Sequence, residues 1–412
     1  MRIQFRRIPM KFDIVVVGGS TAGFYLVKTL RAKGYTGSIG LIDREDTLPY
    51  NRYKLSKTWL TGKTLDAPIF KPESFFDEND IKLLLNTEVV AVDEDAKQVI
   101  TADQQTITYG QLVLAMGAES RHLHLPNDDA EGIFYLRSYH DAIKIKQWSE
   151  QVKDVVLIGA GFIGLELASS FRKLGLNVTV VEHGQHPLGR VVGPQASEYF
   201  VKMHQEQGVK FVLGSGVESF THDQQHQVTG VVTDTGATIP AQMVVVGVGA
   251  VPNTSIKADH LELGQNIVVN EYGETALKDV YAVGDATIWP FQGEEIHVEH
   301  WEHAQSHGKN VAANLIQPQS QPYDVLPYFW TDQYDQTFEY LGHTTKWDQT
   351  FIRGDLDSGK FTIAYVDENQ VPLAILFANG HEQRDDVTEL MSRRQPLDPE
   401  RFADTNQPLS TL

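Results

Sequence analysis

Two glycine-rich turns hold the residues whose types and spacing point most directly to chemistry. The backbone N–H groups at the start of a helix bind pyrophosphate, and small residues in the turn before it let the backbone approach the ligand. Each turn follows an apolar run and precedes a segment with helical spacing. The two turns consist of Gly18, Gly19, Ser20, Ala22 and Gly23, and of Gly159, Gly161, Phe162, Ile163 and Gly164. They predict two dinucleotide sites.

The two turns are not equally complete. The second matches GxGxxG in full, whereas Ser20 replaces the middle glycine of the first. A lone glycine turn often exists only to satisfy backbone geometry. Here an apolar strand, the glycines, a helix and a later acid follow one another in the same order twice, which favours the dinucleotide interpretation.

The later acids lie at the ends of two further apolar runs. Asp43 ends the run 38–43, and Glu182 ends the run 178–182. A carboxylate at this place accepts hydrogen bonds from ribose hydroxyls, and it repels a 2′-phosphate. No arginine follows Glu182 directly, since residues 183–186 read His-Gly-Gln-His. The second site is therefore predicted to prefer NADH over NADPH.

The composition excludes several classes of function. The chain has 412 residues, a formal net charge of −19 and no cysteine. Without a thiolate, neither dithiol relay nor cysteine-based peroxidase chemistry can operate. The acidic balance argues against nucleic acid or an anionic membrane as a partner. The lack of cysteine fits a reducing compartment, so a cytoplasmic location is expected.

The N-terminal segment is basic but has no long apolar core. Residues 1–10 contain Arg2, Arg6 and Arg7 without the apolar stretch of a secretory signal. We expect either a true start at Met10 or a short lead ahead of the first strand. Neither reading involves targeting.

The remaining apolar runs show how the chain is organised. Segments 87–93 and 98–101 alternate and predict a small sheet inserted in the first nucleotide fold. The run 111–118 is expected to return to the parallel sheet of that fold. The run 242–250 predicts another buried strand, which ends in a turn with Gly247 and Gly249.

A proline-punctuated stretch, 317–322, marks the clearest linker. The runs 351–354, 360–365 and 371–377 beyond it predict an antiparallel sheet. The fold class is therefore α/β, with two Rossmann-like nucleotide-binding domains and a C-terminal α+β domain. The expected boundaries are 1–118 with 245–322 for a discontinuous first nucleotide-binding domain, 119–244 for a second nucleotide-binding domain, and 323–412 for a C-terminal interface domain.

Several short segments give the chain a family resemblance over almost its full length. They are PYNRYKLSK at 49–57, GLE at 164–166, YAVGDA at 281–286, EHW at 299–301 and PYFWTD at 327–332. Together with the two turns, they resemble the FAD-dependent ferredoxin reductases of the pyridine-nucleotide disulfide oxidoreductase superfamily. Rubredoxin reductases and apoptosis-inducing factor belong to the same superfamily.

The resemblance implies FAD on the first fold and NAD(H) on the second. It implies catalytic roles for Lys57 and Glu166, which we expect to form an ion pair near the nicotinamide. Besides the two turns and their acids, it implies cofactor contacts for Arg52, Lys57, Val89, Ala115, Gly117, Arg121, Arg190, Gly247, Gly249, Asp285, Glu299, His300, Trp301 and Trp330. A cation near the flavin stabilises charge on the reduced ring. Met116 departs from the family pattern, in which threonine is common.

Two groups of residues allow a second interpretation: the two tryptophans, and a cluster of histidines. On burial statistics alone, Trp301 and Trp330 would be core residues rather than neighbours of the isoalloxazine. His303 and His307 have the spacing of a helical metal pair, with His297 and His300 nearby. However, residues 297–301 alternate like a strand and no cysteine is available, so no metal site is expected.

The resemblance also implies the reaction. NADH would reduce the flavin, which would pass single electrons to an external iron–sulfur carrier such as ferredoxin or rubredoxin. The alternatives are an NADH dehydrogenase that uses quinone, dye or oxygen, and an NADH-sensing flavoprotein like apoptosis-inducing factor. Because small carriers are usually acidic, docking needs a local basic patch on this acidic chain. The protein is expected to be a monomer or a homodimer.

Overall fold

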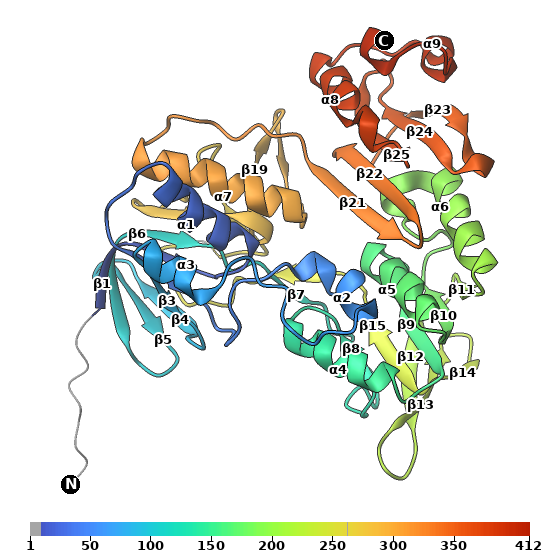
Figure 1. Ribbon diagram of the computed structural model, residues 1–412, viewed down its shortest axis with the longest axis horizontal. Helices are drawn as coiled ribbons and strands as arrows, with labels where there is room; N and C mark the ends of the chain where they lie inside the picture. Colours follow the sequence, from blue (N-terminus) through green and yellow to red (C-terminus); the bar gives the residue numbers. More distant parts are fainter. Residues whose placement is uncertain (1–9, 262) are drawn as a thin grey trace. The chain divides into compact units, whose positions relative to one another are not determined.

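The computed structural model describes residues 10–261 and 263–412. The short lead that the sequence analysis considered ahead of the first strand therefore lies outside the described residues. The described chain forms two compact units, shown in Figure 1. The first comprises the chain up to residue 51 together with 67–119 and 250–325. The second comprises 52–66, 120–249 and 326–412.

A seven-stranded sheet forms the centre of the first unit, in the order β3-β2-β1-β6-β5-β4 with β18 also paired to β6. Strands β1, β2, β3, β6 and β18 are mutually parallel. The bounds are β1 (Met10–Val17), β2 (Ile39–Ile42), β3 (Ile81–Leu84), β4 (Val89–Asp93), β5 (Gln98–Thr101), β6 (Thr106–Leu114) and β18 (Val280–Ala282). The strands buried on both faces are runs of Val, Ile and Leu, as a covered parallel sheet requires.

Helices α1 and α7 pack against each other in this unit, and both contribute to one apolar core with the sheet (Figure 1). The other elements of the unit are short. The bounds of the two helices and of these shorter elements are α1 (Thr21–Ala32), α3 (Glu73–Glu78), α7 (Trp301–Ile316), η2 (Gly284–Ala286), β7 (Ala118–Ser120), β16 (Ala250–Pro252), β17 (Ile267–Val268), β19 (Thr287–Phe291) and β20 (Glu294–Ile296).

The second unit contains a five-stranded parallel sheet in the order β11-β10-β9-β15-β8. Its bounds are β8 (Ile133–Tyr135), β9 (Asp154–Ile158), β10 (Asn177–Glu182), β11 (Lys210–Leu213) and β15 (Met243–Val246). A three-stranded antiparallel sheet accompanies it, with β12 (Val217–His222), β13 (Val228–Thr233) and β14 (Thr238–Pro240). The helical elements are η1 (Arg52–Lys54), α2 (Thr58–Thr61), α4 (Tyr139–Ser149), α5 (Phe162–Lys173) and α6 (Gly189–Glu206).

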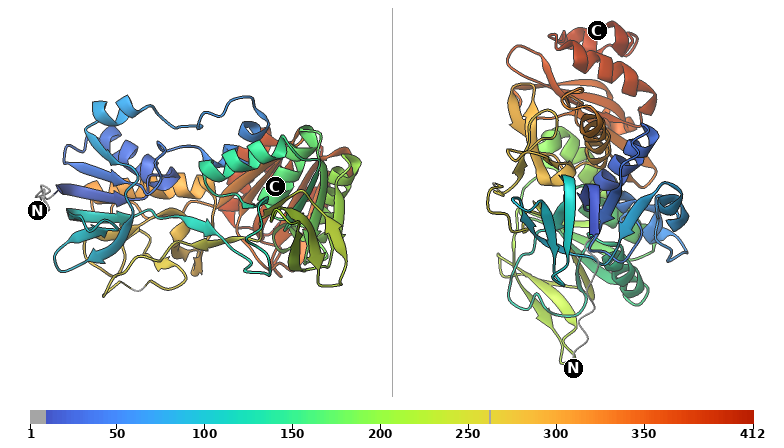
Figure 2. Two further views of the ribbon diagram at one scale, coloured as in Figure 1. Left: turned by 90° about the horizontal axis from the view of Figure 1, so that it is seen from below. Right: turned by 90° about the vertical axis from the view of Figure 1, so that its left-hand side faces the viewer.

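A five-stranded antiparallel sheet completes the second unit, in the order β21-β22-β25-β24-β23. Figure 2 draws its strands in orange and red. One of its faces packs on α8 and α9, and the other shares a core with α5 and α6. Alternation along β24 and β25 produces the two faces: Ile363 and Leu376 point to one core, Ala364 and Ile375 to the other. The bounds are β21 (Tyr328–Gln333), β22 (Gln336–Gly342), β23 (Gln349–Asp355), η3 (Leu356–Ser358), β24 (Lys360–Val366), β25 (Pro372–Ala378), η4 (His381–Gln383), α8 (Arg384–Arg393), α9 (Pro399–Ala403) and η5 (Leu409–Thr411).

The expected fold class is confirmed, with two corrections. Segments 87–93 and 98–101 do not form a separate inserted sheet, because β5 pairs with the first half of β6 and so extends the main sheet. The boundary expected between residues 244 and 245 falls inside β15, whose Val245 and Val246 pair with Leu157 and Ile158 of β9. In the described part of the chain no helix is both long and apolar enough to cross a membrane.

Candidate functional site

The first glycine turn joins β1 to α1 and is held by the end of the neighbouring strand. Gly18 has φ +109°, and a Cβ there would lie 2.1 Å from the carbonyl oxygen of Ala115. Only glycine fits this combination of conformation and close approach. The Gly19 N–H donates to Asp43 Oδ2 at 2.7 Å, so the acid that follows β2 is bound to the turn itself.

The other residues predicted for the first site lie around this turn. A Cβ on Gly284 would be 3.0 Å from the Cβ of Ala22, which places the turn that contains Asp285 against the start of α1. Gly117 follows β6, two residues after Ala115, and Val89 begins β4. Glu299 and His300 directly precede α7, and its first residue, Trp301, packs edge-on against Tyr25.

The second glycine turn repeats the same construction in the second unit. Gly159 has φ +98°, and a Cβ there would lie 2.3 Å from the carbonyl oxygen of Gly247, which follows β15. Glu182, at the end of β10, accepts from the Ala160 N–H at 2.8 Å and from the Gly184 N–H at 2.7 Å. Both predicted acids therefore also order their turns, a role that the sequence analysis did not assign to them.

The remaining residues predicted for the second site are less closely grouped. The Arg121 N–H donates to the carbonyl of Gly249 at 3.0 Å. Ile163 is half exposed at the start of α5, while Phe162 packs edge-on against Phe329 of β21. Arg190 is exposed near the start of α6.

The two turns fit the dinucleotides expected for them. The Ser20 side chain makes no capping hydrogen bond to α1, and Gly161, which precedes α5, has no side chain that could cap it. The first N–H groups of both helices are thus left for an external acceptor. In addition, a Cβ on Gly161 would meet nothing within 4 Å, so the second turn faces open space where a ligand can approach.

A buried ion pair lies between α2 and α5, as expected for Lys57 and Glu166. The Lys57 Nζ is 3.2 Å from Glu166 Oε1, and the two side chains are 9% and 8% exposed. Ser56 Oγ donates to Glu166 Oε2 at 2.5 Å, and Thr331 Oγ1 donates to Oε1 at 2.7 Å. Glu166 therefore has a polar partner on each oxygen, which offsets part of the cost of burying a carboxylate.

Burial raises the pKa of the Glu166 carboxyl, and the Lys57 ammonium opposes this rise. The ammonium also lies 5.3 Å from the centre of the Trp330 ring and 3.0 Å from Asp332 Oδ2. Trp330 packs edge-on against Tyr53 at 5.3 Å. Lys57, Glu166 and Trp330, predicted from three distant motifs, are thus neighbours within one unit.

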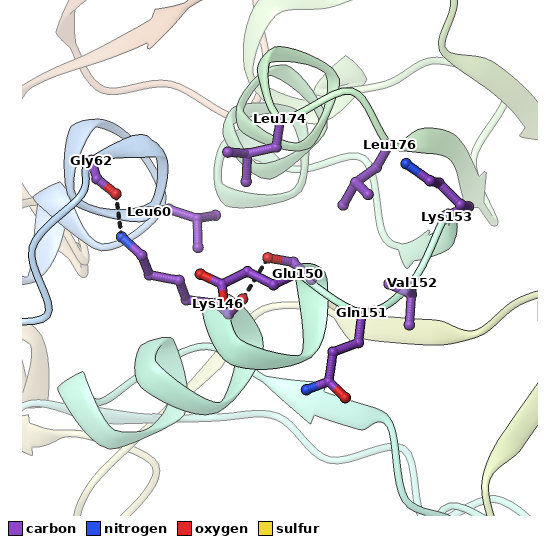
Figure 3. A pocket seen from close by; sticks show the side chains of 10 residues that line it. Leu60, Gly62, Lys146, Glu150, Gln151, Val152, Lys153, Leu174 and Leu176 are labelled. Carbon is purple, nitrogen blue, oxygen red and sulfur yellow. Dashed lines mark hydrogen bonds between the residues drawn. The ribbon is translucent and has the colours of Figure 1, made fainter.

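The segment 52–66 is attached to this unit by a buried lysine. Lys146 of α4 is 6% exposed, and its Nζ donates to the carbonyls of Trp59, Gly62 and Thr64. Figure 3 shows this ammonium beside a pocket that is lined by Leu60, Leu174 and Leu176. Burial lowers the pKa of Lys146. The sequence analysis missed this residue, because a lysine on a helix carries no signal of burial.

The four histidines are not arranged as a strand. Residues 297–300 have no regular structure, and His303 and His307 lie inside α7. His303 stacks on Trp289 at 4.1 Å, and His307 stacks on Tyr323 at 4.7 Å. Burial lowers the pKa of His307 to about 3. The described residues contain no group of three or more His, Asp or Glu side chains placed to hold a metal ion.

Two protein-family models together match nearly the whole chain. Residues 12–308 match the pyridine nucleotide-disulphide oxidoreductase model, and residues 328–412 match the reductase C-terminal model. The chain belongs to the pyridine nucleotide-disulphide oxidoreductases. Members of this family use FAD and NAD(H), so the two expected cofactors are confirmed.

Within this oxidoreductase family, several of the similar proteins are reductases of small electron carriers. Rhodocoxin reductase from Rhodococcus erythropolis is 34% identical over 96% of this chain and 92% of its own length. The crystal structure of the ferredoxin reductase for the CYP199A2 system from Rhodopseudomonas palustris has a TM-score of 0.92, 34% identity, and coverage of 97% of this chain and 99% of its own. The covalent putidaredoxin reductase–putidaredoxin complex has a TM-score of 0.91 and 29% identity, with 98% of each chain covered. The resemblance to ferredoxin reductases is therefore confirmed.

Proposed function

We propose that this protein oxidises NADH through FAD and passes single electrons to a small iron–sulfur carrier, either a ferredoxin or a rubredoxin. The similarity to carrier reductases over 96% or more of the chain, including the C-terminal domain, is the observation that supports it most strongly. The lack of cysteine is consistent with this function, because without a protein dithiol the electrons must leave to an external acceptor.

Each of the two turns would bind one of the two cofactors. The first turn, with Asp43 and Asp285, would hold FAD, and the second turn, with Glu182, would hold NADH. FAD supplies the change from two-electron to one-electron chemistry. We retain a division into FAD-binding, NAD-binding and C-terminal domains. The C-terminal end of the NAD-binding domain moves from residue 244 to Gly249, so that the whole of β15 belongs to this domain.

The catalytic work is assigned to the buried ion pair. Glu166 holds the Lys57 ammonium in one direction, and Ser56 and Thr331 fix the carboxylate in turn. A cation held in this way stabilises negative charge on a reduced flavin ring. The low exposure of both side chains keeps water away from the pair, which strengthens its electrostatic effect.

The acceptor is tested by reduction of cytochrome c with NADH, with and without an added [2Fe–2S] ferredoxin or a rubredoxin. Turnover that depends on the carrier supports the proposal. Fast turnover without a carrier would favour the dehydrogenase instead. Slow reoxidation of the reduced protein together with a change of oligomeric state would favour the NADH sensor. We propose the cytoplasm as the compartment, and either a monomer or a homodimer.

The preference for NADH is tested at Glu182. Replacing Glu182 with glutamine removes the charge that repels a 2′-phosphate and keeps one acceptor for the turn N–H groups. We expect the ratio of kcat/KM for NADPH to that for NADH to rise about 10-fold or more, as for the loss of one close charge contact. Glu206→Gln, an exposed acid on α6, serves as the control. A wild-type enzyme that already prefers NADPH would contradict the assignment.

A further inference from the structure

Asp332 of β21 contacts both Lys57 and Trp330, two residues for which the family resemblance implies a place near the flavin. Its Oδ2 lies 3.0 Å from the Lys57 Nζ and accepts from the Trp330 Nε1–H at 3.2 Å. Its Oδ1 accepts from Thr337 Oγ1 at 2.9 Å. The side chain is 45% exposed, unlike those of Lys57 and Glu166. One carboxylate oxygen thus contacts both the lysine and the tryptophan.

The strand register fixes this position. Asp332 pairs with Thr337 across β21 and β22, which brings the threonine hydroxyl to its second oxygen. Side chains two residues apart on a strand point to the same face, so Trp330 and Asp332 are neighbours by construction. The sequence analysis quoted Asp332 as part of a motif but gave it no role.

The charges around Lys57 do not balance. One ammonium lies between two carboxylates, Glu166 at 3.2 Å and Asp332 at 3.0 Å. The two carboxylates therefore share one positive charge, and Asp332 neutralises part of it from the exposed side of the site. The same ammonium lies 5.3 Å from the ring centre of Trp330, so the lysine, the indole and Asp332 form a closed triangle of contacts.

We propose that Asp332 is a positioning residue that sets the direction of the Lys57 ammonium and the plane of the Trp330 indole together, and that its charge lowers the electron affinity of the bound flavin. The reason is electrostatic: an anion beside the ammonium reduces the stabilisation that the cation gives to the reduced ring. The effect on the flavin rests on the proposed function, whereas the hold on Trp330 does not.

The charge effect is tested with Asp332→Asn in the FAD-loaded protein. The variant keeps the shape of the side chain and removes its charge, so the equilibrium for two-electron reduction should move about 10-fold toward the reduced form. For a two-electron couple this is a rise in midpoint potential of about 30 mV. Asp335→Asn removes the same charge from the turn after β21, where the side chain is fully exposed, and should leave the potential unchanged. Equal potentials in the wild type and Asp332→Asn would overturn the proposed charge effect.

The positioning is tested without reference to the flavin. In protein labelled with ¹⁵N-tryptophan, the Trp330 indole N–H is identified by its loss in Trp330→Phe. Its hydrogen exchange should become at least several-fold faster in Asp332→Ala and stay unchanged in Asp335→Ala. Unchanged exchange in Asp332→Ala would overturn the positioning role. A protein that binds no FAD would overturn the proposed function and the effect on potential, but the exchange rate would still decide the positioning role.

Discussion

Replacing Glu166 with alanine is expected to slow the reduction of bound FAD by NADH roughly 100-fold, which is about 2.7 kcal/mol of transition-state stabilisation. The carboxylate holds the Lys57 ammonium 3.2 Å away in a site that is nearly closed to water. Without it, the ammonium keeps the half-exposed Asp332 and the ring of Trp330 as neighbours and turns toward solvent. Rapid mixing under anaerobic conditions, followed through the flavin absorbance, measures the rate.

Intermediate variants make the Glu166 prediction sharper. Ser56→Ala and Thr331→Val each remove one donor to Glu166 and should give smaller losses than Glu166→Ala. Glu206→Ala, on the exposed face of α6, should leave the rate at the wild-type value. An unchanged rate in Glu166→Ala would remove the residue from the mechanism.

Removing the other partner, in Lys57→Met, leaves a buried carboxylate without a cation. Breaking a buried pair in this way costs about 3–5 kcal/mol of unfolding free energy. Burial raises the pKa of Glu166, so the stability linked to its protonated form is present at low pH and lost as pH rises through the raised pKa. Denaturant unfolding should therefore show a larger deficit for this variant at pH 8 than at pH 5.

Gly159→Ala is expected to disrupt the second nucleotide site and the unit that carries it. Alanine in a left-handed conformation costs about 1–2 kcal/mol. The new Cβ would also lie 2.3 Å from the carbonyl oxygen of Gly247, so β9 or β15 must shift. We expect a loss of about 3 kcal/mol or more in unfolding free energy, together with the loss of saturable NADH binding. Denaturant titration and stopped-flow reduction measure the two effects.

Gly161→Ala is the matched comparison in the same turn. Its φ is −76°, which alanine adopts without strain, and its Cβ would meet nothing within 4 Å. The variant should keep the unfolding free energy of the wild type, yet raise the KM for NADH at least 10-fold, because the Cβ occupies the space in which pyrophosphate approaches the backbone. A normal KM in Gly161→Ala would show that the dinucleotide does not bind at this turn.

The sequence predicted those features that short stretches of chain determine. The glycine turns, Asp43 after β2 and Glu182 at the end of β10 follow from local patterns, because strand, turn and helix are adjacent along the chain. The antiparallel sheet could also be predicted, because strand-like runs in β23, β24 and β25 follow one another along the chain with short turns between them. Family motifs, rather than periodicity, suggested that Lys57 and Glu166 form a pair.

What the sequence could not give depends on long-range register. Asp332 meets Lys57 across 275 positions of the chain, and only the pairing of β21 with β22 fixes where its carboxylate points. The extension of the first sheet by β4 and β5 depends on which edge of β6 is open, and no local pattern encodes this. Lys146 looks like any surface lysine until the three carbonyls that surround it are known.

The attachment of residues 52–66 by Lys146 has a consequence for engineering by recombination. Along the chain, this segment lies between two parts of the first unit, which end at residue 51 and resume at residue 67. Its contacts, however, belong to the second unit. Exchanging residues 120–249 between two reductases would therefore combine the Lys57 of one parent with the Glu166 and Lys146 of the other. A chimera designed by three-dimensional units should carry 52–66 and 326–412 along with the exchanged block, so that ammonium, carboxylate and indole are inherited from a single parent.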